Sequence, residues 1–474
     1  MPKHIAILGA GPGGYVAAIR AAQLGGRVTV IESQALGGVC LNWGCIPSKA
    51  LLSVVELGDK LKKADSLGLS VAGPVAYDLP RMVTRKNHVV STLVKGIATL
   101  FKAWSIEHIE GVGVLDGPDS IKVDLRSGGV RKVQADAIVI ATGSSWPNLR
   151  EFPIDGERIL TSRQLLDLQR APTSLVILGG GVEGCEFACL FSGLGTAVTV
   201  VELMDRILPL EDEEISSLMA RELKKRGVTV LTGTTIEKAE PVSDALTMQM
   251  KDGSQLVAPM LLVSVGRGFN SRGIGLERVG VQVGRRGEIV VDDRMETNVP
   301  GIFAIGDVVG KAMLAHVASA QGKVAVENIL GHSTTINYDV IPTGIFTLPE
   351  VGRVGLTEAQ AWERAQAKGL NPLDAVQVGR FRLAALGKAQ ATGETTGLCK
   401  LVAEAKTGKV LGAHMIGSHA ADLIHEAALA MQVGATVGQL AHMIHAHPTL
   451  AEAMMEAAED AEGRAIHQLQ KRAG

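Results

Sequence analysis

The residues Ile5-Ala6-Ile7-Leu8-Gly9-Ala10-Gly11-Pro12-Gly13-Gly14 decide the fold of this chain. The apolar run predicts a strand over 5–8, a Gly-x-Gly-x-x-Gly turn follows it, and a helix over 15–24 leads to a strand over 27–31 and Glu32. The same unit recurs as a strand over 174–178, Gly179-Gly180-Gly181-Val182-Glu183-Gly184, a helix over 185–194, a strand over 197–201 and Glu202. In both copies the acidic residue follows the last glycine by 18 positions. Two copies in the same complete context are far more specific than one glycine motif.

This unit has the physical requirements of a dinucleotide site. The first glycine permits a tight turn, the second lets the backbone approach a pyrophosphate, and the third lets the helix pack on the strand. The pyrophosphate then lies at a helix N-terminus, where free N–H groups favour anions. The acid accepts hydrogen bonds from a ribose, and because a carboxylate repels a 2′-phosphate, Glu202 favours NAD over NADP. The sequence therefore predicts an α/β protein with two dinucleotide sites.

Composition narrows the class of protein further. The chain has 474 residues, of which 46% are hydrophobic, so it can form sizeable cores. Its formal net charge of −2 gives no broad footprint for nucleic acid or anionic membrane. We find no secretory signal pattern and no apolar run of about 18 residues, and five cysteines are too few for a disulfide scaffold. We expect a cytoplasmic protein that binds neither nucleic acid nor membrane.

Two cysteines follow the first glycine unit in Gly37-Gly38-Val39-Cys40-Leu41-Asn42-Trp43-Gly44-Cys45-Ile46-Pro47-Ser48-Lys49. Five residues of regular helix rise about 7.5 Å, and Cα atoms more than about 7 Å apart cannot carry a disulfide. A disulfide here needs an irregular turn, which Gly44 and Pro47 permit. Cys45 would then begin a helix, where the dipole lowers the pKa of a thiol. A catalytic pair is favoured over zinc because no second cysteine pair accompanies it, and two unrelated core residues are the alternative. Cys185, Cys189 and Cys399 have no partner pattern, and Cys185 and Cys189, four residues apart on the predicted second helix, are interpreted as buried small residues.

A second cluster is His445-Ala446-His447-Pro448-Thr449-Leu450-Ala451-Glu452. Pro448 suits the first position of a helix, which predicts His447 as its cap. Glu452, one turn further on, could orient the imidazole as a general base. A surface histidine cluster with His442, or a metal site, are the alternatives on spacing alone.

The cysteine segment closely resembles the redox-active segment of the flavoprotein disulfide reductases, in which a Cys-x4-Cys disulfide lies beside FAD. The run from Gly37 through Ala50-Leu51-Leu52 and the His445–Glu452 run are most similar to the dihydrolipoamide dehydrogenases of that family. Both glycine turns, Ala141-Thr142-Gly143, Gly306-Asp307 and the C-terminal run occur in family order. The resemblance implies oxidation of protein-bound dihydrolipoyl groups to lipoyl disulfide, with electrons passing through Cys40–Cys45 and FAD to NAD+.

Site residues are carried over by motif, and the resemblance implies no metal. The catalytic residues would be Cys40, Cys45, His447 and Glu452. FAD would be held by Gly9, Gly11, Gly14, Glu32 and Asp307, with Lys49, paired with Glu186, near its ring and with Gly113, Thr142, Gly143 and Ala315 lining its site. NAD would be bound by Gly179, Gly181, Gly184, Glu202, Ile236 and Gly266. Glu183 departs from the family, which usually has an apolar residue at that position.

The resemblance also implies partners and a domain order. It implies an obligate homodimer in which His447 reaches the disulfide of the other subunit, and lipoylated domains of 2-oxoacid dehydrogenase or glycine cleavage complexes as substrates. We expect two Rossmann-like dinucleotide-binding domains, the FAD domain being discontinuous, and a C-terminal α+β dimerisation domain. The expected ranges are 1–147 (FAD), 148–270 (NAD), 271–343 (FAD, second segment) and 344–474 (interface). Mercuric reductase is less similar because the tail lacks a vicinal cysteine pair. A low-molecular-weight disulfide reductase and a non-catalytic flavoprotein scaffold are further alternatives.

Overall fold

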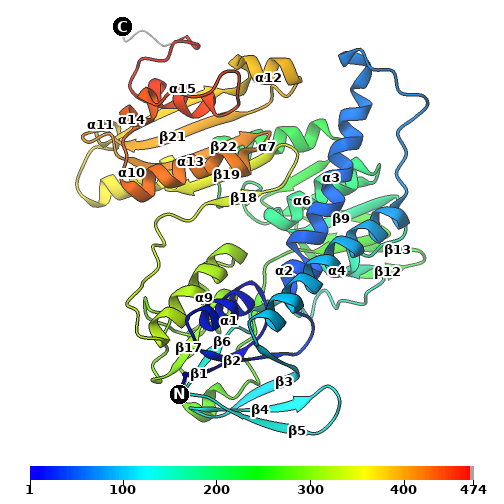
Figure 1. The fold of residues 1–474 in the computed structure, drawn as a ribbon. Helices are drawn as coiled ribbons and strands as arrows, with labels where there is room; N and C mark the ends of the chain where they lie inside the picture. Colours follow the sequence, from blue (N-terminus) through cyan, green and yellow to red (C-terminus); the bar gives the residue numbers. More distant parts are fainter. Residues whose placement is uncertain (470–474) are drawn as a thin grey trace.

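The computed structural model describes residues 1–469 of the chain. Within that range, the strands form a seven-stranded sheet, two five-stranded sheets and smaller two- and three-stranded sheets. Figure 1 shows two helix-covered α/β units and a separate C-terminal layer of strands and helices. The predicted fold class, two Rossmann-like units with a C-terminal α+β domain, is confirmed.

The seven-stranded sheet contains the first glycine unit and has the order β17-β6-β1-β2-β3-β4-β5. Strand β1 pairs in parallel with both β2 and β6, so Ile5 lies opposite Val28 on one side and Ala137 on the other. Strand β17 pairs in parallel with β6, although the whole second glycine unit lies between them in the sequence. The strands are β1 (His4–Leu8), β2 (Arg27–Glu32), β3 (Glu107–Gly117), β4 (Ser120–Leu125), β5 (Val130–Gln134), β6 (Ala137–Ile140) and β17 (Ile302–Ala304).

The second glycine unit lies in a five-stranded sheet with the order β11-β10-β9-β15-β8, in which all neighbours are parallel. Its strands are β8 (Ile159–Leu160), β9 (Ser174–Leu178), β10 (Ala197–Glu202), β11 (Thr229–Thr232) and β15 (Met260–Val263), with the antiparallel β12 (Ile236–Val242), β13 (Ala245–Met250) and β14 (Gln255–Ala258) nearby. Helices α1 (Pro12–Gln23) and α6 (Val182–Gly193) begin inside the two glycine turns rather than after them. The helix N-termini therefore lie directly at the turns.

The C-terminal layer is an antiparallel sheet of order β18-β19-β22-β21-β20 with helices packed on it. Its strands β21 (Leu398–Glu404) and β22 (Val410–Gly417) form an antiparallel hairpin. The other elements of the layer are β18 (Thr343–Ile345), β19 (Glu350–Gly355), β20 (Val376–Arg382), α10 (Glu358–Ala367), α11 (Pro372–Ala375), η3 (Leu383–Ala385), α12 (Gly387–Thr392), α13 (Ala420–Val433), α14 (Val437–His442) and α15 (Glu452–Ala461).

The prediction that a helix starts at Pro448, with His447 as its cap, is wrong. Helix α15 begins at Glu452, and its N-cap is Ala451. Two hydrogen bonds form a turn just before this helix. Thr449 donates its backbone N–H to Glu452 Oε2 (2.8 Å) and its hydroxyl to the Ala446 carbonyl (2.8 Å). His447 therefore lies in an irregular segment.

The cysteine segment forms two consecutive helices, α2 (Gly38–Trp43) and α3 (Cys45–Lys62), which Gly44 separates. Residues 38–62 together are long and apolar enough, by length and composition only, to cross a membrane. However, Gly44 interrupts the helix with φ −137° and ψ −107°, and α3 packs along α4 (Leu79–Ala103) and α6. The remaining elements are η1 (Ala64–Leu67), β7 (Ser144–Ser145), α5 (Ser162–Leu165), α7 (Glu213–Lys225), β16 (Gly268–Phe269), α8 (Leu276–Val279), η2 (Gly306–Val309) and α9 (Ala315–Ile329).

A buried group of charges joins the second unit to the C-terminal sheet. Lys400 on β21 is 2% exposed, and its ammonium contacts Asp212 Oδ1 (2.8 Å), Glu214 Oε2 (2.7 Å) and Glu358 Oε2 (2.7 Å). Asp212 also caps α7 by accepting the Glu214 N–H. Burial alone would lower the pKa of Lys400, but its bonds to the three carboxylates raise it. This charge group fixes the C-terminal sheet against α7.

Candidate active site

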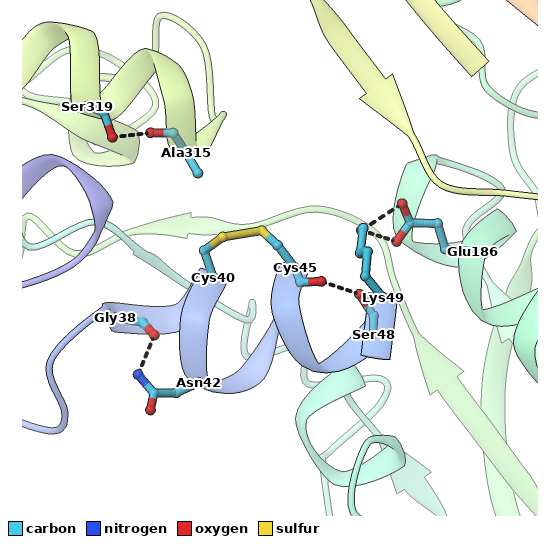
Figure 2. Close-up of a disulfide and its surroundings, with 9 residues drawn as sticks. All are labelled: Gly38, Cys40, Asn42, Cys45, Ser48, Lys49, Glu186, Ala315 and Ser319. Atoms are coloured by element: carbon cyan, nitrogen blue, oxygen red, sulfur yellow. Dashed lines mark hydrogen bonds and ion pairs between the residues drawn. A yellow bond between two sulfur atoms is a disulfide. The ribbon is translucent and has the colours of Figure 1, made fainter. Parts of the chain in front are cut away.

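The structure joins Cys40 and Cys45 in a disulfide on the side of the first glycine unit (Figure 2). Cys40 lies in the middle of α2, and Cys45 is the first residue of α3. The break at Gly44 brings their Cα atoms to 4.7 Å, well below the rise of an uninterrupted helix over five residues. Asn42 anchors α2 by donating from Nδ2 to the carbonyls of Leu36 and Gly38. The irregular turn that a disulfide requires is therefore present.

The disulfide is the redox centre of this chain because the other cysteines are inert. Cys185, Cys189 and Cys399 are free and fully buried, as expected for Cys185 and Cys189. Burial raises the pKa of Cys189 to about 11 and that of Cys399 to about 12. A thiol that stays protonated is a poor nucleophile. Cys45, in contrast, lies at a helix N-terminus, where a thiolate is stabilised.

Lys49 lies one turn along α3 from Cys45 and forms an ion pair with Glu186 of α6 (Figure 2). Its ammonium bonds both carboxylate oxygens, at 2.9 and 2.7 Å, and lies 4.7 Å from the centre of the Phe346 ring. Glu186 is almost fully buried and also accepts the Phe346 N–H (2.9 Å). The pair links the disulfide helix to the second glycine unit.

The first glycine turn has the shape that a dinucleotide needs. Gly9 has φ +108°, and an added Cβ would lie 2.3 Å from the Ala141 carbonyl oxygen. A Cβ at Gly14 would lie 1.9 Å from the Gly9 oxygen, whereas the nearest atom to a Cβ at Gly11 is 3.9 Å away. Gly9 and Gly14 are thus required by the chain itself, and Gly11 leaves an open surface at the N-terminus of α1. Glu32 accepts the Ala10 N–H at 2.7 Å and retains further lone pairs for a ribose.

The second turn repeats this geometry. Gly179 has φ +112°, a Cβ at Gly184 would lie 1.9 Å from the Gly179 oxygen, and a Cβ at Gly181 would meet nothing within 4 Å. Glu202 accepts the N–H groups of Gly180 (2.6 Å) and Met204 (2.8 Å). The residues of both turns therefore fit the dinucleotides FAD and NAD, respectively.

Polar residues converge where β6, β17 and the second unit meet. Asp307, in η2 just after β17, accepts the Ser144 hydroxyl. Arg267 donates from Nε to Ser144 Oγ (2.7 Å) and from Nη2 to the Ser144 carbonyl (2.9 Å). Burial lowers the pKa of Arg267, which Asp307 and Glu183 partly offset. The sequence had no signal for Ser144 or Arg267, since neither belongs to a motif.

The remaining predicted cofactor residues are placed around these turns. Thr142 and Gly143 follow β6 and bond the backbone and side chain of Asn270. Ala315 begins α9, whose backbone contacts the first turn: a Cβ on Gly322 of that helix would lie 2.6 Å from the Gly13 oxygen. Gly113 packs among core side chains on β3, Ile236 is buried at the start of β12, and Gly266 follows β15 with φ +111°.

Glu183 is the residue of the second turn that differs from the family pattern, and its side chain contacts a residue just after a neighbouring strand. Its Oε2 accepts the Ser264 hydroxyl at 3.0 Å, just beyond β15. The carboxylate therefore has a partner within its own unit and leaves the glycine geometry of the turn intact.

His447 and Glu452 form a pair at the surface of the C-terminal layer. His447 Nδ1 lies 2.8 Å from Glu452 Oε1, and the histidine side chain is 74% exposed. Burial alone would raise the pKa of Glu452, but the Thr449 N–H and His447 lower it. Because Nδ1 is engaged by the carboxylate, Nε2 is the nitrogen available to a substrate. Figure 1 shows the helices α2, which carries Cys40, and α15, which begins at Glu452, in separate parts of the molecule.

Comparison with known proteins identifies the family. The pyridine nucleotide-disulphide oxidoreductase model matches residues 3–322, and the dimerisation domain of that family matches residues 341–458. Dihydrolipoyl dehydrogenases from Chlorobaculum tepidum and Bacillus subtilis are each 42% identical, with 96% and 98% coverage of both chains, respectively. The crystal structure of LpdA from Mycobacterium tuberculosis has a TM-score of 0.89 at 31% identity and covers 96% of this chain and 99% of that chain. The HOCl-induced flavoprotein disulfide reductase RclA from Escherichia coli has a TM-score of 0.84 at 28% identity, with coverages of 96% and 99%. The chain is thus an oxidoreductase and belongs to the pyridine nucleotide-disulphide oxidoreductase family.

Proposed function

We propose that this chain oxidises protein-bound dihydrolipoyl groups to lipoyl disulfide and transfers the electrons to NAD+. The observation that carries the proposal is the Cys40–Cys45 disulfide, held at the start of α3 beside one dinucleotide turn and linked through Lys49 to the other. The relatives named dihydrolipoyl dehydrogenase support this substrate, because they match nearly the full chain.

The cysteine chemistry exchanges one disulfide for another. A substrate thiolate attacks Cys40 Sγ, breaking the Cys40–Cys45 bond and releasing Cys45 as a thiolate. The second substrate thiolate then attacks the substrate sulfur of this mixed disulfide, which forms lipoyl disulfide and releases Cys40. The substrate has lost two electrons, and the cysteine pair has gained them. The N-terminus of α3 stabilises the Cys45 thiolate throughout.

His447 provides the base. Only a thiolate is an effective nucleophile, so each substrate thiol must lose its proton as it attacks. Nε2 of His447 accepts the proton of the first thiol, while Glu452 holds the ring through Nδ1 and stabilises the imidazolium that forms. In the second attack the proton of the second thiol passes to the departing Cys40 sulfur. Because the dimerisation domain of the family matches residues 341–458 and the helices α2 and α15 lie in separate parts of the molecule, we infer a homodimer in which each C-terminal domain completes the site of the other chain.

FAD and NAD are the cofactors of this function. FAD, when bound, would supply the two-electron redox chemistry that connects the cysteine pair to NAD+. We propose that Gly9, Gly11, Gly14, Glu32 and Asp307 hold FAD, that Gly113, Thr142, Gly143 and Ala315 line its ring, and that Gly179, Gly181, Gly184, Glu202, Ile236 and Gly266 hold NAD. Lys49, fixed by Glu186, would place its positive charge near the ring and favour negative charge there.

The proposed substrate proteins and the proposed cellular location rest on the similarity of this chain to its relatives. The lipoylated domains of 2-oxoacid dehydrogenase or glycine cleavage complexes are the proposed substrates, and a cytoplasmic location stays a prediction. The four domain ranges also stay predictions.

The test replaces Cys45 with serine. Cys45→Ser should abolish dihydrolipoamide-dependent NADH formation while the purified variant keeps its FAD, because the disulfide is lost and the glycine turns are untouched. Cys399→Ala, at a buried free cysteine, is the control and should retain activity. Full activity of Cys45→Ser would overturn the mechanism. Wild-type activity with low-molecular-weight disulfides but none with dihydrolipoamide would assign another substrate in the same family.

A further inference from the structure

His445 lies two residues before the proposed base and has the opposite environment. Its side chain is 3% exposed, against 74% for that of His447. Its neighbours Ile444 and Ala446 are exposed, so of these three residues only His445 has its side chain buried in the protein. A buried histidine in an irregular surface segment requires polar partners.

Both ring nitrogens of His445 face oxygen atoms that can only accept hydrogen bonds. Nε2 lies 2.9 Å from Glu426 Oε1, and Nδ1 lies 3.0 Å from the Met443 carbonyl oxygen. The imidazole of His445 donates an N–H to these acceptors, and neither oxygen can donate in return. Through Nε2 the ring contacts Glu426, whose side chain is 23% exposed on α13.

This pair is the connection between the His447 segment and the helix beneath it. Residues 443–451 lie between α14 and α15 and belong to neither helix. The other side-chain bonds of the segment, from Thr449 to Ala446 and to Glu452, are local to it or to the start of α15. Without the pair, the segment would keep its internal turn but lose its polar attachment to α13.

We propose that His445 is a positioning residue for His447, and that its contact with Glu426 holds the segment so that His447 and Glu452 face the second chain in one arrangement. The inference rests on the proposed function, since it concerns the base of that reaction. A base displaced by about 1 Å from its productive position can lose about 100-fold in rate. His445 itself contacts neither the substrate nor the disulfide of its own chain.

The experiment separates positioning from folding by following two half-reactions in the FAD-bound dimer. Reduction of the enzyme by dihydrolipoamide needs His447, whereas reduction by NADH does not. His445→Gln and Glu426→Gln should each slow the dithiol half-reaction by about 10- to 100-fold and leave the NADH half-reaction within about twofold of wild type. The double variant should be no slower than the slower single variant, because residues that act as a pair are not additive. His419→Gln, at an exposed histidine of the same layer, should match wild type in both half-reactions.

His447→Gln in the same assay distinguishes the failure of this inference from that of the proposed function. If His447→Gln loses the dithiol half-reaction while His445→Gln and Glu426→Gln keep it, the positioning role is wrong and the function stands. If both half-reactions fall equally in the His445 and Glu426 variants, the pair is only structural. If His447→Gln retains the wild-type rate, the proposed base is wrong, and the positioning role fails with it.

Discussion

Alanine substitutions in the second glycine turn should separate nucleotide binding from folding. Gly181 and Gly184 lie three residues apart at the start of α6, but their surroundings differ. A Cβ at Gly184 would lie 1.9 Å from the Gly179 carbonyl oxygen, while a Cβ at Gly181 would meet no protein atom within 4 Å. Gly181 also has φ −74°, which alanine adopts freely. We therefore expect Gly184→Ala to lower the stability of the protein and Gly181→Ala to weaken the binding of NAD.

The magnitudes follow from these contacts. The clash at Gly184 is with backbone, which cannot move aside as a side chain can, so Gly184→Ala should cost at least about 1–3 kcal/mol of unfolding free energy. At Gly181, a less favourable helix cap is offset by the lower entropy of the unfolded chain, and the net change should stay within about 1 kcal/mol. The new methyl group would keep a pyrophosphate from the N-terminus of α6. One lost hydrogen bond to a charged group, worth about 1.5–3 kcal/mol, weakens NAD binding by roughly 10- to 150-fold.

Thermal unfolding and NAD titration of the purified variants test both statements. Gly181→Ala should unfold near the wild-type temperature, keep FAD and undergo reduction by dihydrolipoamide normally, with a KM for NAD raised at least about tenfold. Gly11→Ala in the first turn is the matched comparison, and it should lose FAD rather than NAD. Unchanged NAD affinity in Gly181→Ala, or wild-type stability in Gly184→Ala, would refute the assignment of these glycines.

Two further predictions concern the charges between α7 and the C-terminal sheet. Lys400→Met should destabilise the protein by about 3–5 kcal/mol, because it leaves Asp212 and its neighbouring carboxylates without their buried cation; Lys406→Met, at an exposed lysine, should be neutral in the same denaturant titration. Glu211 is 4% exposed, and burial raises its pKa to about 7 despite the nearby Arg353. Between about pH 4.5 and pH 7 the unfolded chain releases the Glu211 proton while the folded protein still binds it, so the stability of the wild type falls as the pH rises through this range. The Glu211→Gln variant should therefore gain roughly 2.5 kcal/mol relative to wild type between pH 5 and pH 8. A pH-independent difference between the two proteins would contradict this prediction.

Local patterns predicted much of the fold and the redox centre. The sequence places the two glycine units correctly because an apolar strand and a glycine-rich tight turn each leave a signal within a few residues. The break at Gly44 was anticipated for the same reason, since a disulfide over five residues requires it. The helix start at Pro448 was wrong because the bonds from Thr449 to Ala446 and Glu452, which the motif does not reveal, close a turn first.

Contacts between distant segments could not be predicted from local patterns. Ser144 joins Asp307 and Arg267 only because three separate segments meet at the edges of two sheets. The Lys400 ammonium contacts carboxylates at the start of α7 and on α10, which are remote from Lys400 in the sequence. Such side chains carry no periodicity or spacing of their own, and their partners become evident only from the packing of the sheets.

The most direct test is an anaerobic titration of the purified protein with dihydrolipoamide, followed by addition of NAD+ and monitored by visible and near-ultraviolet absorption. We predict a flavin spectrum at the start, which develops a long-wavelength band as the Cys40–Cys45 disulfide is reduced and Cys45 becomes a thiolate beside the flavin. NADH should then appear in proportion to the dithiol consumed. A protein without flavin absorption, or one whose disulfide dihydrolipoamide does not reduce, would contradict the proposed function.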